Sequence, residues 1–277
     1  MVGGNERLWN NSILMDHAVI RTLRTKTFTR RWPLDEQMRA AAATVPSHFF
    51  LQNPAGQNLY VYLSRFVKEM SERHFGRPFG EITVLDWGCG KGQMSKLIRD
   101  LNPKQIDSCD LLTNNDDSAF GQKTPIIDRF GIQVKPLEHE YVLPYEDASF
   151  DVILSVGVLE HVPKERASLL EIMRVLKPGG LFFCFFLPTN LSWTQKLAHL
   201  RGNFYHDRFY NEQLIKELTK EAGLEILDFW YRQFFPKNNV RYPNYYLFEK
   251  MDQFITQHTF LKYFATNIEF VSVKPHL

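Results

Sequence analysis

The sequence contains few cysteines and no long hydrophobic run. Its three cysteines, Cys89, Cys109 and Cys184, form no Cys-x-x-Cys pair, so we expect neither a disulfide framework nor a structural zinc site. The longest apolar run, around Leu181 to Leu187, is the length of a strand and far short of the roughly 20 residues of a membrane-spanning helix. The first residues lack the hydrophobic stretch of a signal peptide. These absences predict a cytoplasmic protein without a transmembrane segment.

An excess of one charge is also missing, because 33 Lys and Arg stand against 31 Asp and Glu, a net charge of +2. This balance, without any recognisable RNA-binding motif, argues against a nucleic-acid partner. Residues 1–80 are nevertheless basic, with 11 Lys and Arg against 6 Asp and Glu, and a cluster lies between Arg21 and Arg31. We interpret the cluster mainly as a solvated surface. Contact with an anionic substrate, a phosphate or a membrane surface is the alternative.

The first part of the chain has helical patterns. A helix is expected from Pro33 to Val45, because proline is favoured at a helix start and Pro46 ends the pattern. From Leu59 to Met70 apolar residues recur at i, i+3, i+4 and i+7, which predicts an amphipathic helix that ends near Gly76. We therefore assign residues 1–78 to an N-terminal helical extension packed on the core.

After Gly80, short apolar runs alternate with helical segments. The predicted strands are 82–87, 105–110, 132–137, 150–156, 180–187, 224–235 and 268–273, and the predicted helices are 92–101, 164–176 and 211–223. Asn211 and Gly223 are residue types that favour the start and the end of the last helix. Alternating strands and helices with apolar strands predict an α/β fold with a mostly parallel sheet covered on both faces.

Two segments, 188–210 and 236–266, are too long to be plain loops, and we interpret them as insertions that form a lid on a domain of residues 79–277. Both are rich in aromatic residues, which favours a pocket for a small, lipid-like or sugar acceptor. The aromatic residues singled out are Trp193, Phe204, Tyr205, Phe209, Tyr210, Tyr242, Tyr245 and Tyr246. The second insertion also carries an apolar helical stripe between Phe248 and Phe264, which we expect chiefly to pack against the sheet.

The most informative motif is a glycine-rich turn between the first strand and the next helix. Gly88, Gly90 and Gly92 stand at alternate positions, and glycine lets a ligand lie directly against the backbone. Asp86, just before the turn, would repel a pyrophosphate but suits a ligand that carries an ammonium or sulfonium charge. Asp110 ends the second strand, 22 residues after Gly88, where an acid can accept hydrogen bonds from ribose hydroxyls.

These motifs resemble those of the class I S-adenosylmethionine-dependent methyltransferases over about residues 59–235. LDWGCGKG (85–92) is similar to the first motif of the family, and Asp110 matches its ribose-binding acid. LPYEDASFDVILSVGVLEHV (143–162) and LKPGG (176–180) follow in the family's order. The resemblance implies a Rossmann-like sheet of seven strands and an enzyme that transfers a methyl group from S-adenosylmethionine.

The resemblance also implies which residues hold that cofactor. They are Asp86, Gly88, Cys89, Gly90, Asp110, Leu111, Glu140, Tyr141, Ser155 and Val156. Asp86 would orient the methionine portion, directly or through water, and Ser155 and Val156 would face the same portion. Asp110 would hold the ribose, with Leu111 against the adenine. Glu140 would meet the adenine amino group, with Glu138 and His139 as alternatives.

A hydroxyl acceptor would need a base, and histidine is the residue suited to this at neutral pH. His161 follows the fourth predicted strand, and His206 precedes the helix that begins near Asn211. We predict both as catalytic candidates and slightly prefer His206; the alternative for each is that it only fixes a loop. Ubiquinone-type O-methyltransferases of the family have Glu-x-x-Glu-His near His161, where Gly157 replaces the first Glu here. Glu160 and His161 alone are too few ligands, so we predict no metal.

The sequence leaves three functions open. The first is methylation of a hydroxyl on a small metabolite, a sugar or a lipid-linked intermediate. The second is methylation of a macromolecule such as protein or RNA, and the third is binding of S-adenosylmethionine without catalysis. Neither the acceptor nor the oligomeric state follows from the sequence.

Overall fold

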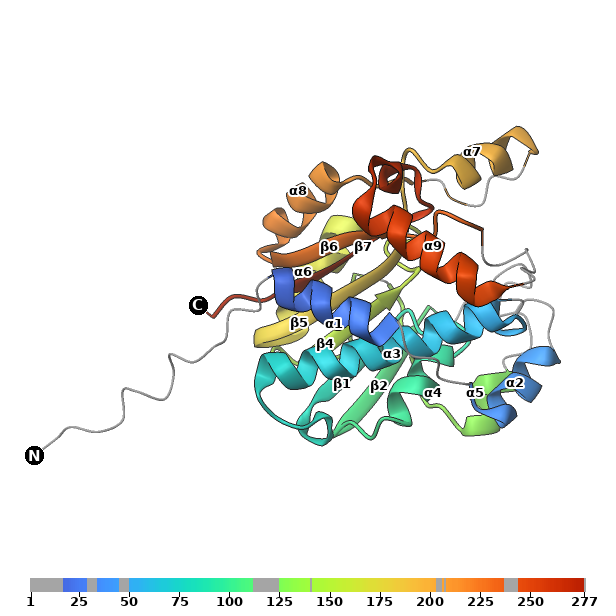
Figure 1. Cartoon of the computed structure of the whole chain (residues 1–277). Helices are drawn as coiled ribbons and strands as arrows, with labels where there is room; N and C mark the ends of the chain where they lie inside the picture. The colour runs from blue at the N-terminus through green and yellow to red at the C-terminus, as the bar shows by residue number, and fades with distance from the viewer. Residues whose placement is uncertain are drawn as a thin grey trace, which may run out of the picture.

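The fold is centred on a seven-stranded sheet with the strand order β3-β2-β1-β4-β5-β7-β6 (Figure 1). The computed structural model describes residues 17–28, 34–44, 50–111, 125–139, 141–202, 206, 208–236 and 244–276. The strands are β1 (Thr83–Trp87), β2 (Gln105–Asp110), β3 (Val134–Pro136), β4 (Phe150–Val156), β5 (Leu176–Pro188), β6 (Glu225–Arg232) and β7 (Asn267–Val273). β7 is antiparallel to both of its neighbours, and the other paired strands are parallel. The expected Rossmann-like, mostly parallel sheet is confirmed.

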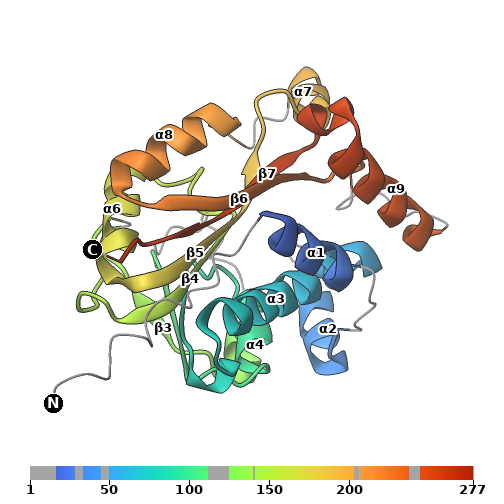
Figure 2. The same cartoon turned by 60° about the vertical axis from the view of Figure 1, so that its left-hand side comes forward.

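Helices cover both faces of the sheet (Figure 2). They are α1 (His17–Phe28), α2 (Glu36–Ala43), α3 (Pro54–Phe75), α4 (Gln93–Arg99), α5 (Pro125–Phe130), α6 (Glu165–Val175), α7 (Trp193–Leu200), α8 (Glu212–Ala222) and α9 (Tyr245–His258), with short 3-10 turns η2 (Phe79–Glu81) and η3 (Phe260–Phe264). α1, α3 and α4 lie on one face, and α6 and α8 lie on the other. α7 and α9 lie at one end of the sheet and protrude from these layers.

The central strands are apolar because both of their faces are covered. Every residue of β1 is buried, and in β4 only Val156 is partly exposed. The sequence predicted the bounds of β2 and β4 correctly, and β5 is longer than predicted because it starts at Leu176. Helix α8 also agrees with its prediction: Asn211 accepts a hydrogen bond from the backbone N–H of Leu214 at 2.9 Å, and Gly223 ends the helix with φ 82°.

Helix α3 is part of the same hydrophobic core as the sheet. Tyr62 and Phe66 have no exposed surface. The ring of Phe66 meets Phe183 of β5 edge-on at 6.0 Å and Trp230 of β6 at 5.6 Å. The helix ends at Gly76, as predicted, in a left-handed conformation with φ 63°. A division of the chain at residue 78 therefore stays a proposal, and α3 supports the sheet directly.

The three cysteines are free and buried. Within the described part of the chain, every helix is too short or too polar to cross a bilayer.

Candidate active site

The glycine-rich turn lies at the carboxyl end of β1 and is bonded to the end of β2. The backbone N–H groups of Gly88 and Cys89 both donate to the carbonyl oxygen of Cys109, at 2.9 and 3.1 Å. Gly88 and Gly90 have φ values of 70° and 55°, a region that side chains other than glycine rarely occupy. A methyl group at Gly88 would lie 2.5 Å from the side chain of Val158, whereas one at Gly90 would have no atom of the described residues within 4 Å. Gly90 therefore borders open space against which a ligand can lie.

Asp110 stands next to this open space. Its Oδ2 atom accepts a hydrogen bond from the backbone N–H of Gly90 at 2.7 Å. Burial raises the pKa of Asp110 to about 6, against the opposing effect of hydrogen bonds from the backbone of Gly90 and Leu111. Leu111 is half-buried and packs against the hydrophobic core. The structure thus brings the predicted ribose acid to the predicted turn, and a ligand with hydroxyl groups fits this pair.

Asp86 lies deeper, underneath the turn. Its side chain is 1% exposed and accepts a hydrogen bond from Oγ of Ser95 at 2.6 Å, and Ser108 donates to the same Ser95 oxygen at 2.9 Å. Burial raises the pKa of Asp86 to about 7. The visible contact of Asp86 therefore fixes α4 to β1, and its role toward the methionine portion stays a prediction. Sequence reasoning missed Ser95, although its place in the first turn of the helix after the glycines was a usable signal.

The end of β4 lies beside the turn, because Ser155 is in register with Trp87 of β1. Ser155 has no exposed surface, and Val156 is half-buried against the core that includes α3. Of these two predicted cofactor residues, Val156 is the one that reaches the surface.

The segment expected to meet the adenine is described only in part. Glu140, the preferred residue, lies outside the described residues. Glu138 and His139 are exposed. Tyr141 stacks on His139 with 5.2 Å between ring centroids, and Nζ of Lys164 lies 4.3 Å from the centre of the Tyr141 ring. The adenine contact therefore stays a prediction.

The two candidate bases meet at the carboxyl end of β4. The rings of His161 and His206 are stacked, with centroids 5.5 Å apart and an angle of 28° between their planes. The side chain of His161 is 46% exposed, and His206 is partly buried. The sequence presented them as alternatives on separate segments, whereas the structure places them in one cluster.

Two side chains fasten the His206 segment to the loop that follows β4. Arg208 donates hydrogen bonds to the carbonyl oxygens of Val162 and Pro163. The buried Tyr210 donates from its hydroxyl to Oε2 of Glu165 at 2.8 Å. Tyr210, predicted to line an acceptor pocket, is therefore an anchor. Arg208 was not singled out from the sequence, because nothing in a single charged residue indicates which distant carbonyls it will reach.

Glu160 completes the cluster. It is 5% exposed, and its Oε1 atom lies 3.8 Å from Nε2 of His161. Burial raises the pKa of Glu160 to about 8, so below that pH the carboxyl is mostly uncharged. Within the described residues, its Oε2 atom is buried without a hydrogen-bond partner. A buried acid beside two imidazoles is a suitable environment for a proton or a cation.

Glu160, His161 and His206 each offer one ligand atom, and these atoms all lie within 4.8 Å of one another. Three protein ligands with an open position are the pattern of catalytic zinc sites. The prediction of no metal counted only Glu160 and His161, because His206 is 45 residues away in the sequence. The three side chains fit a divalent ion in number and type, and the absence of a metal stays a prediction.

The other aromatic residues of the insertions have different roles. Trp193 fastens α7 by donating from Nε1 to the carbonyl oxygen of Phe234 at 2.8 Å, and Phe209 meets His199 edge-on at 5.7 Å. Tyr246 is half-buried. Phe204, Tyr205, Tyr242 and the side chain of Tyr245 lie outside the described residues. The aromatic lining of an acceptor pocket remains a prediction.

Comparison with known proteins connects this geometry to methyl transfer. Residues 85–184 match a family model described as a methyltransferase domain. A ubiquinone biosynthesis O-methyltransferase of Maricaulis maris is 30% identical over 183 residues, which cover 58% of this chain and 67% of that protein. A sterol 24-C-methyltransferase of Neurospora crassa is 30% identical over 141 residues, 49% of this chain and 35% of that protein. The chain therefore spans only part of the length of both relatives.

Among solved structures, the YcgJ protein of Bacillus subtilis superimposes with a TM-score of 0.52 at 17% identity, covering 77% of this chain and 98% of that one. At this identity the likeness shows the fold alone.

Proposed function

Because this chain belongs to the class I S-adenosylmethionine-dependent methyltransferase family, we propose that it methylates a hydroxyl group on a small metabolite, a sugar or a lipid-linked intermediate in the cytoplasm. The chain is an S-adenosylmethionine-dependent methyltransferase; the acceptor is the proposed part. The observation that carries the proposal is the stacked pair of His161 and His206 at the end of β4, the sheet edge that also holds the glycine turn.

Two neighbouring groups of residues would bind the cofactor and activate the acceptor. Gly90 and Asp110 would hold the cofactor, since the turn borders open space and the acid is bonded to it. The cofactor supplies an activated methyl group on sulfur together with its leaving group. Alignment of the acceptor with that methyl group can contribute an effective concentration of about 10⁵–10⁸ M.

His206 would take the proton from the acceptor hydroxyl as the new oxygen–carbon bond forms. His161 would support the orientation of its ring through stacking at 5.5 Å, and Arg208 and Tyr210 would keep the loop in place. Because burial raises the pKa of Glu160, its carboxyl group is mostly uncharged at neutral pH. It therefore adds little negative charge beside the two histidines. A general base of this kind contributes about 10²–10⁴-fold in rate.

The cluster of Glu160, His161 and His206 also supports a second mode of activation. A divalent cation held by the three side chains would polarise the acceptor hydroxyl as a Lewis acid. Dialysis against EDTA distinguishes the two modes: a rate that is lost and returns with added Mg²⁺ or Zn²⁺ identifies a metal, and an unchanged rate identifies the base.

The acceptor is identified by incubating the protein with labelled S-adenosylmethionine and fractionated cell extract, followed by mass analysis of the labelled product. We expect label in a small hydroxyl compound, a sugar or a lipid. Label that disappears after protease or nuclease treatment would assign a macromolecular acceptor instead. Tight binding of S-adenosylmethionine without label transfer to any fraction would assign a non-catalytic binding module.

A further inference from the structure

Helix α9 has its polar side inward and its apolar side outward. Glu249, Asp252 and Thr256 are buried, at positions i, i+3 and i+7 of one helix face. Leu247 and Phe254 are 51% and 61% exposed and lie on another face. The expectation that the apolar stripe packs against the sheet is therefore wrong for its exposed members. This arrangement is the reverse of an ordinary surface helix, whose apolar stripe faces the core.

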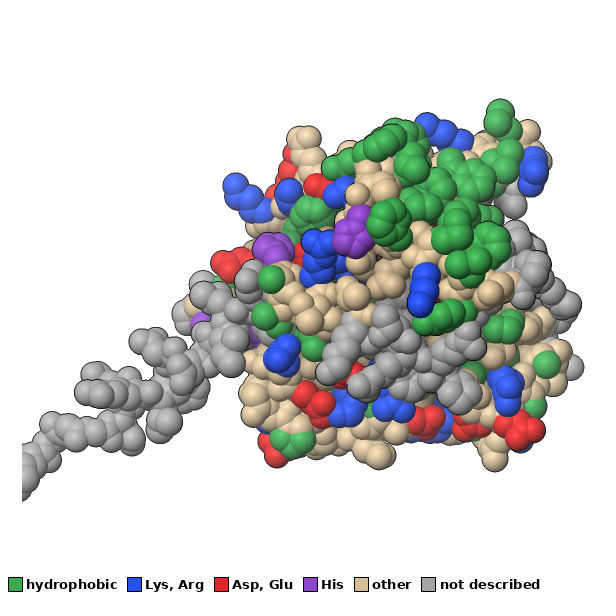
Figure 3. All heavy atoms as spheres, in the orientation of Figure 1, with side chains coloured by type: hydrophobic (Ala, Val, Ile, Leu, Met, Phe, Trp, Pro, Cys, Tyr) green, Lys and Arg blue, Asp and Glu red, His purple; other side chains and the backbone are tan. Residues whose placement is uncertain are grey.

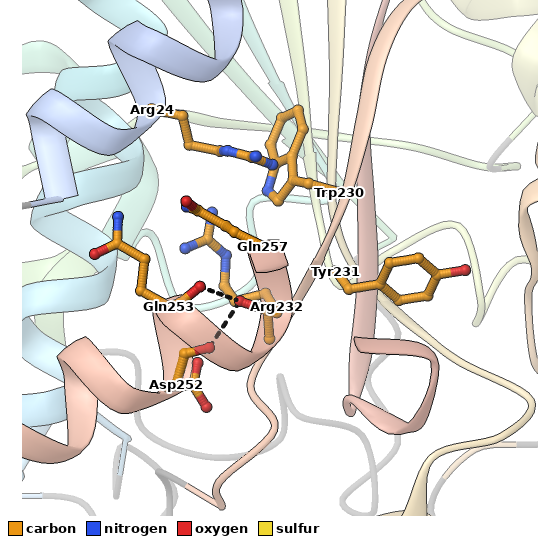
Figure 4. Close-up of a pocket in the computed structure, with 8 residues that line it drawn as sticks. Arg24, Trp230, Tyr231, Arg232, Asp252, Gln253 and Gln257 are labelled. Carbon is orange, nitrogen blue, oxygen red and sulfur yellow. Dashed lines mark hydrogen bonds between the residues drawn. The ribbon is translucent and has the colours of Figure 1, made fainter. Parts of the chain in front are cut away.

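The inward side is polar because buried charges lie opposite it. Arg24 of α1 and Arg232 of β6 line, with α9, a cavity of about 20 Å³, which is about the space of one water molecule. Figure 4 shows polar residues of α9, among them Gln253 and Gln257, on the side of the helix that faces these arginines. Asp252 also accepts a hydrogen bond from the backbone N–H of Phe235 at 2.8 Å. Polar contacts thus fix the orientation of α9 and turn its apolar side outward.

The outward side of α9 is continuous with further apolar residues on α7 and η3. Of the eleven large hydrophobic residues that are exposed in the described part of the chain, nine belong to this region, which we call the apolar face. They are Leu191, Leu197, Leu200, Leu247, Met251, Phe254, Phe260, Tyr263 and Phe264. Figure 3 shows the hydrophobic side chains gathered over α7, α9 and η3. Single exposed apolar residues are common on protein surfaces, whereas a contiguous patch of them marks an interaction site.

The elements that carry the apolar face are held together. Trp193 of α7 contacts Phe234 with 6.1 Å between ring centroids, and Phe235, the next residue, contacts Phe248 of α9 at 5.7 Å. Tyr231 of β6 contacts Tyr263 of η3 at 5.3 Å. The apolar face is therefore built on the sheet through aromatic contacts.

Cations lie on the same elements as the apolar face. Lys196 on α7, Arg201 after it and Lys250 on α9 are exposed, and Lys262 on η3 is half-buried. The acids of the same elements, Glu249 and Asp252 of α9, are buried. Arg21 of α1, part of the basic cluster seen in the sequence, is exposed and reaches Nδ1 of His258 at the end of α9 at 3.4 Å. Among the described residues of α7, α9 and η3, the charged side chains that are not buried are therefore all cations; these cations and Arg201 are called the positive border.

We propose that the apolar face docks the protein on the surface of an anionic lipid bilayer. Apolar side chains flanked by Lys and Arg are the pattern of interfacial binding, in which the apolar part enters the headgroup region and the cations meet anionic lipids. A second copy of this chain would bring two positive borders together, and a soluble apolar partner would leave the cations without a role. Charge complementarity therefore favours the bilayer.

The apolar face lies at the end of the sheet where the parallel strands have their carboxyl ends, as does the active-site turn. α7 begins five residues after the end of β5, and α9 and η3 lie between the end of β6 and the start of β7. β6 runs parallel to β5, and β7 is antiparallel to both. The carboxyl ends of β5 and β6 and the start of β7 therefore lie on the same side of the sheet as the carboxyl ends of β1 and β4. Docking would thus bring the active site close to the bilayer, whichever acceptor the enzyme uses.

The test is binding of the full chain to vesicles, measured by co-sedimentation. We expect binding to vesicles of phosphatidylcholine with phosphatidylglycerol, and weak binding to phosphatidylcholine alone. Leu247→Ser with Phe254→Ser should weaken binding at least about tenfold, because both half-exposed side chains lose apolar area that would be buried. Leu170→Ser is the matched control, since Leu170 is 55% exposed on α6, away from the apolar face, and should bind as the wild type does.

The positive border is tested with Lys196→Gln and Lys250→Gln. Each should weaken binding to the anionic vesicles about fivefold, which corresponds to ~1 kcal/mol per cation near such a surface, while Lys220→Gln on α8 should have little effect. S-adenosylmethionine binding and the thermal unfolding temperature should stay unchanged in all variants, which separates docking from folding and from the proposed function.

Three results would overturn the proposal. The first is no binding of the wild type to anionic vesicles. The second is equal loss of binding in the Leu170→Ser control and in the double variant. The third is a wild type that is dimeric by analytical ultracentrifugation, remains dimeric with vesicles and becomes monomeric in the double variant, which would assign the apolar face to a second copy.

Discussion

Replacing Gly90 by alanine should weaken S-adenosylmethionine binding while leaving the domain folded. Gly90 has φ 55°, and a methyl group at this residue would meet no atom of the described chain within 4 Å. The added methyl group therefore meets only whatever ligand lies against the turn. Overpacking by one methyl group costs about 1–3 kcal/mol, so at ~1.4 kcal/mol per tenfold we expect roughly 5- to 150-fold weaker binding.

Gly76→Ala is the matched control for backbone strain. Gly76 ends α3 with φ 63°, and a methyl group there would also have no atom within 4 Å among the residues that the structure describes. Both variants should therefore lose a similar free energy of unfolding, about 1–2 kcal/mol, from the left-handed conformation. Only Gly90→Ala should change cofactor affinity, because Gly76 lies before β1, at the opposite end of that strand from the turn.

Urea unfolding measures the free energy of unfolding of the two variants. Titration calorimetry measures their affinity for S-adenosylmethionine. Equal dissociation constants for S-adenosylmethionine in the two alanine variants would refute the reasoning, because they would mean that the cofactor does not lie against Gly90. An unfolded Gly90→Ala beside a folded Gly76→Ala would refute the claim that the space next to Gly90 is open.

Asp110→Ala should weaken S-adenosylmethionine binding by about 1–3 kcal/mol, because it removes an ionised acceptor from the ribose hydroxyls; an unchanged dissociation constant in calorimetry would reject this assignment. Cofactor binding at a pH just below 7 should release a fraction of a proton, because burial raises the pKa of Asp86 to about 7, so the carboxyl is partly protonated in the free protein, and a cationic ligand lowers that pKa again. Calorimetry in buffers of different ionisation enthalpy measures this release, and a buffer-independent enthalpy would contradict it. His206→Ala should lower the maximal rate about 100-fold or more with little change in cofactor affinity, and the rise of the rate with pH between about 5 and 8 should disappear. His161→Ala should also weaken cofactor binding, because His161 follows Ser155 and Val156, the residues predicted to face the methionine portion. A rate that neither substitution changes would remove both histidines from the mechanism.

Local patterns in the sequence were sufficient for most of the sheet. β4 has the predicted bounds, because a strand buried on both faces is apolar along most of its length. β2 also has the predicted bounds, although only Ser108 and Cys109 of this strand are buried. The caps of α8 were predictable for a similar reason, since Asn211 and Gly223 satisfy helix ends through chemistry within a few residues. Helix α1 was missed because its buried residues, such as Ile20 and Leu23, are few among basic ones.

The site was predictable only where each residue acts next to its own strand. Asp110 and Gly90 could be placed together, because Asp110 ends β2 and Gly90 follows β1, and these two neighbouring strands are parallel. His206 joins Glu160 and His161 through a loop held by Arg208, and such a contact between distant segments leaves no periodicity in the sequence. The outward stripe of α9 shows the same limit: spacing reveals that a stripe exists, but the buried charges opposite the helix decide which side faces the protein.

The position of β7 in the sheet has a consequence for the synthesis of the chain. β7 pairs with β5 on one side and with β6 on the other, so these two strands are made before the strand that joins them. β5 has 13 residues and is the longest strand that the structure describes. Until residues 267–273 have left the ribosome, the backbone groups on one side of β5 are unpaired, and β6 has no strand beside it to pair with. Unpaired strand edges attract other chains, so the nascent protein is most exposed to aggregation between the release of β6 and the arrival of β7. Removal of β7 would make that transient state permanent.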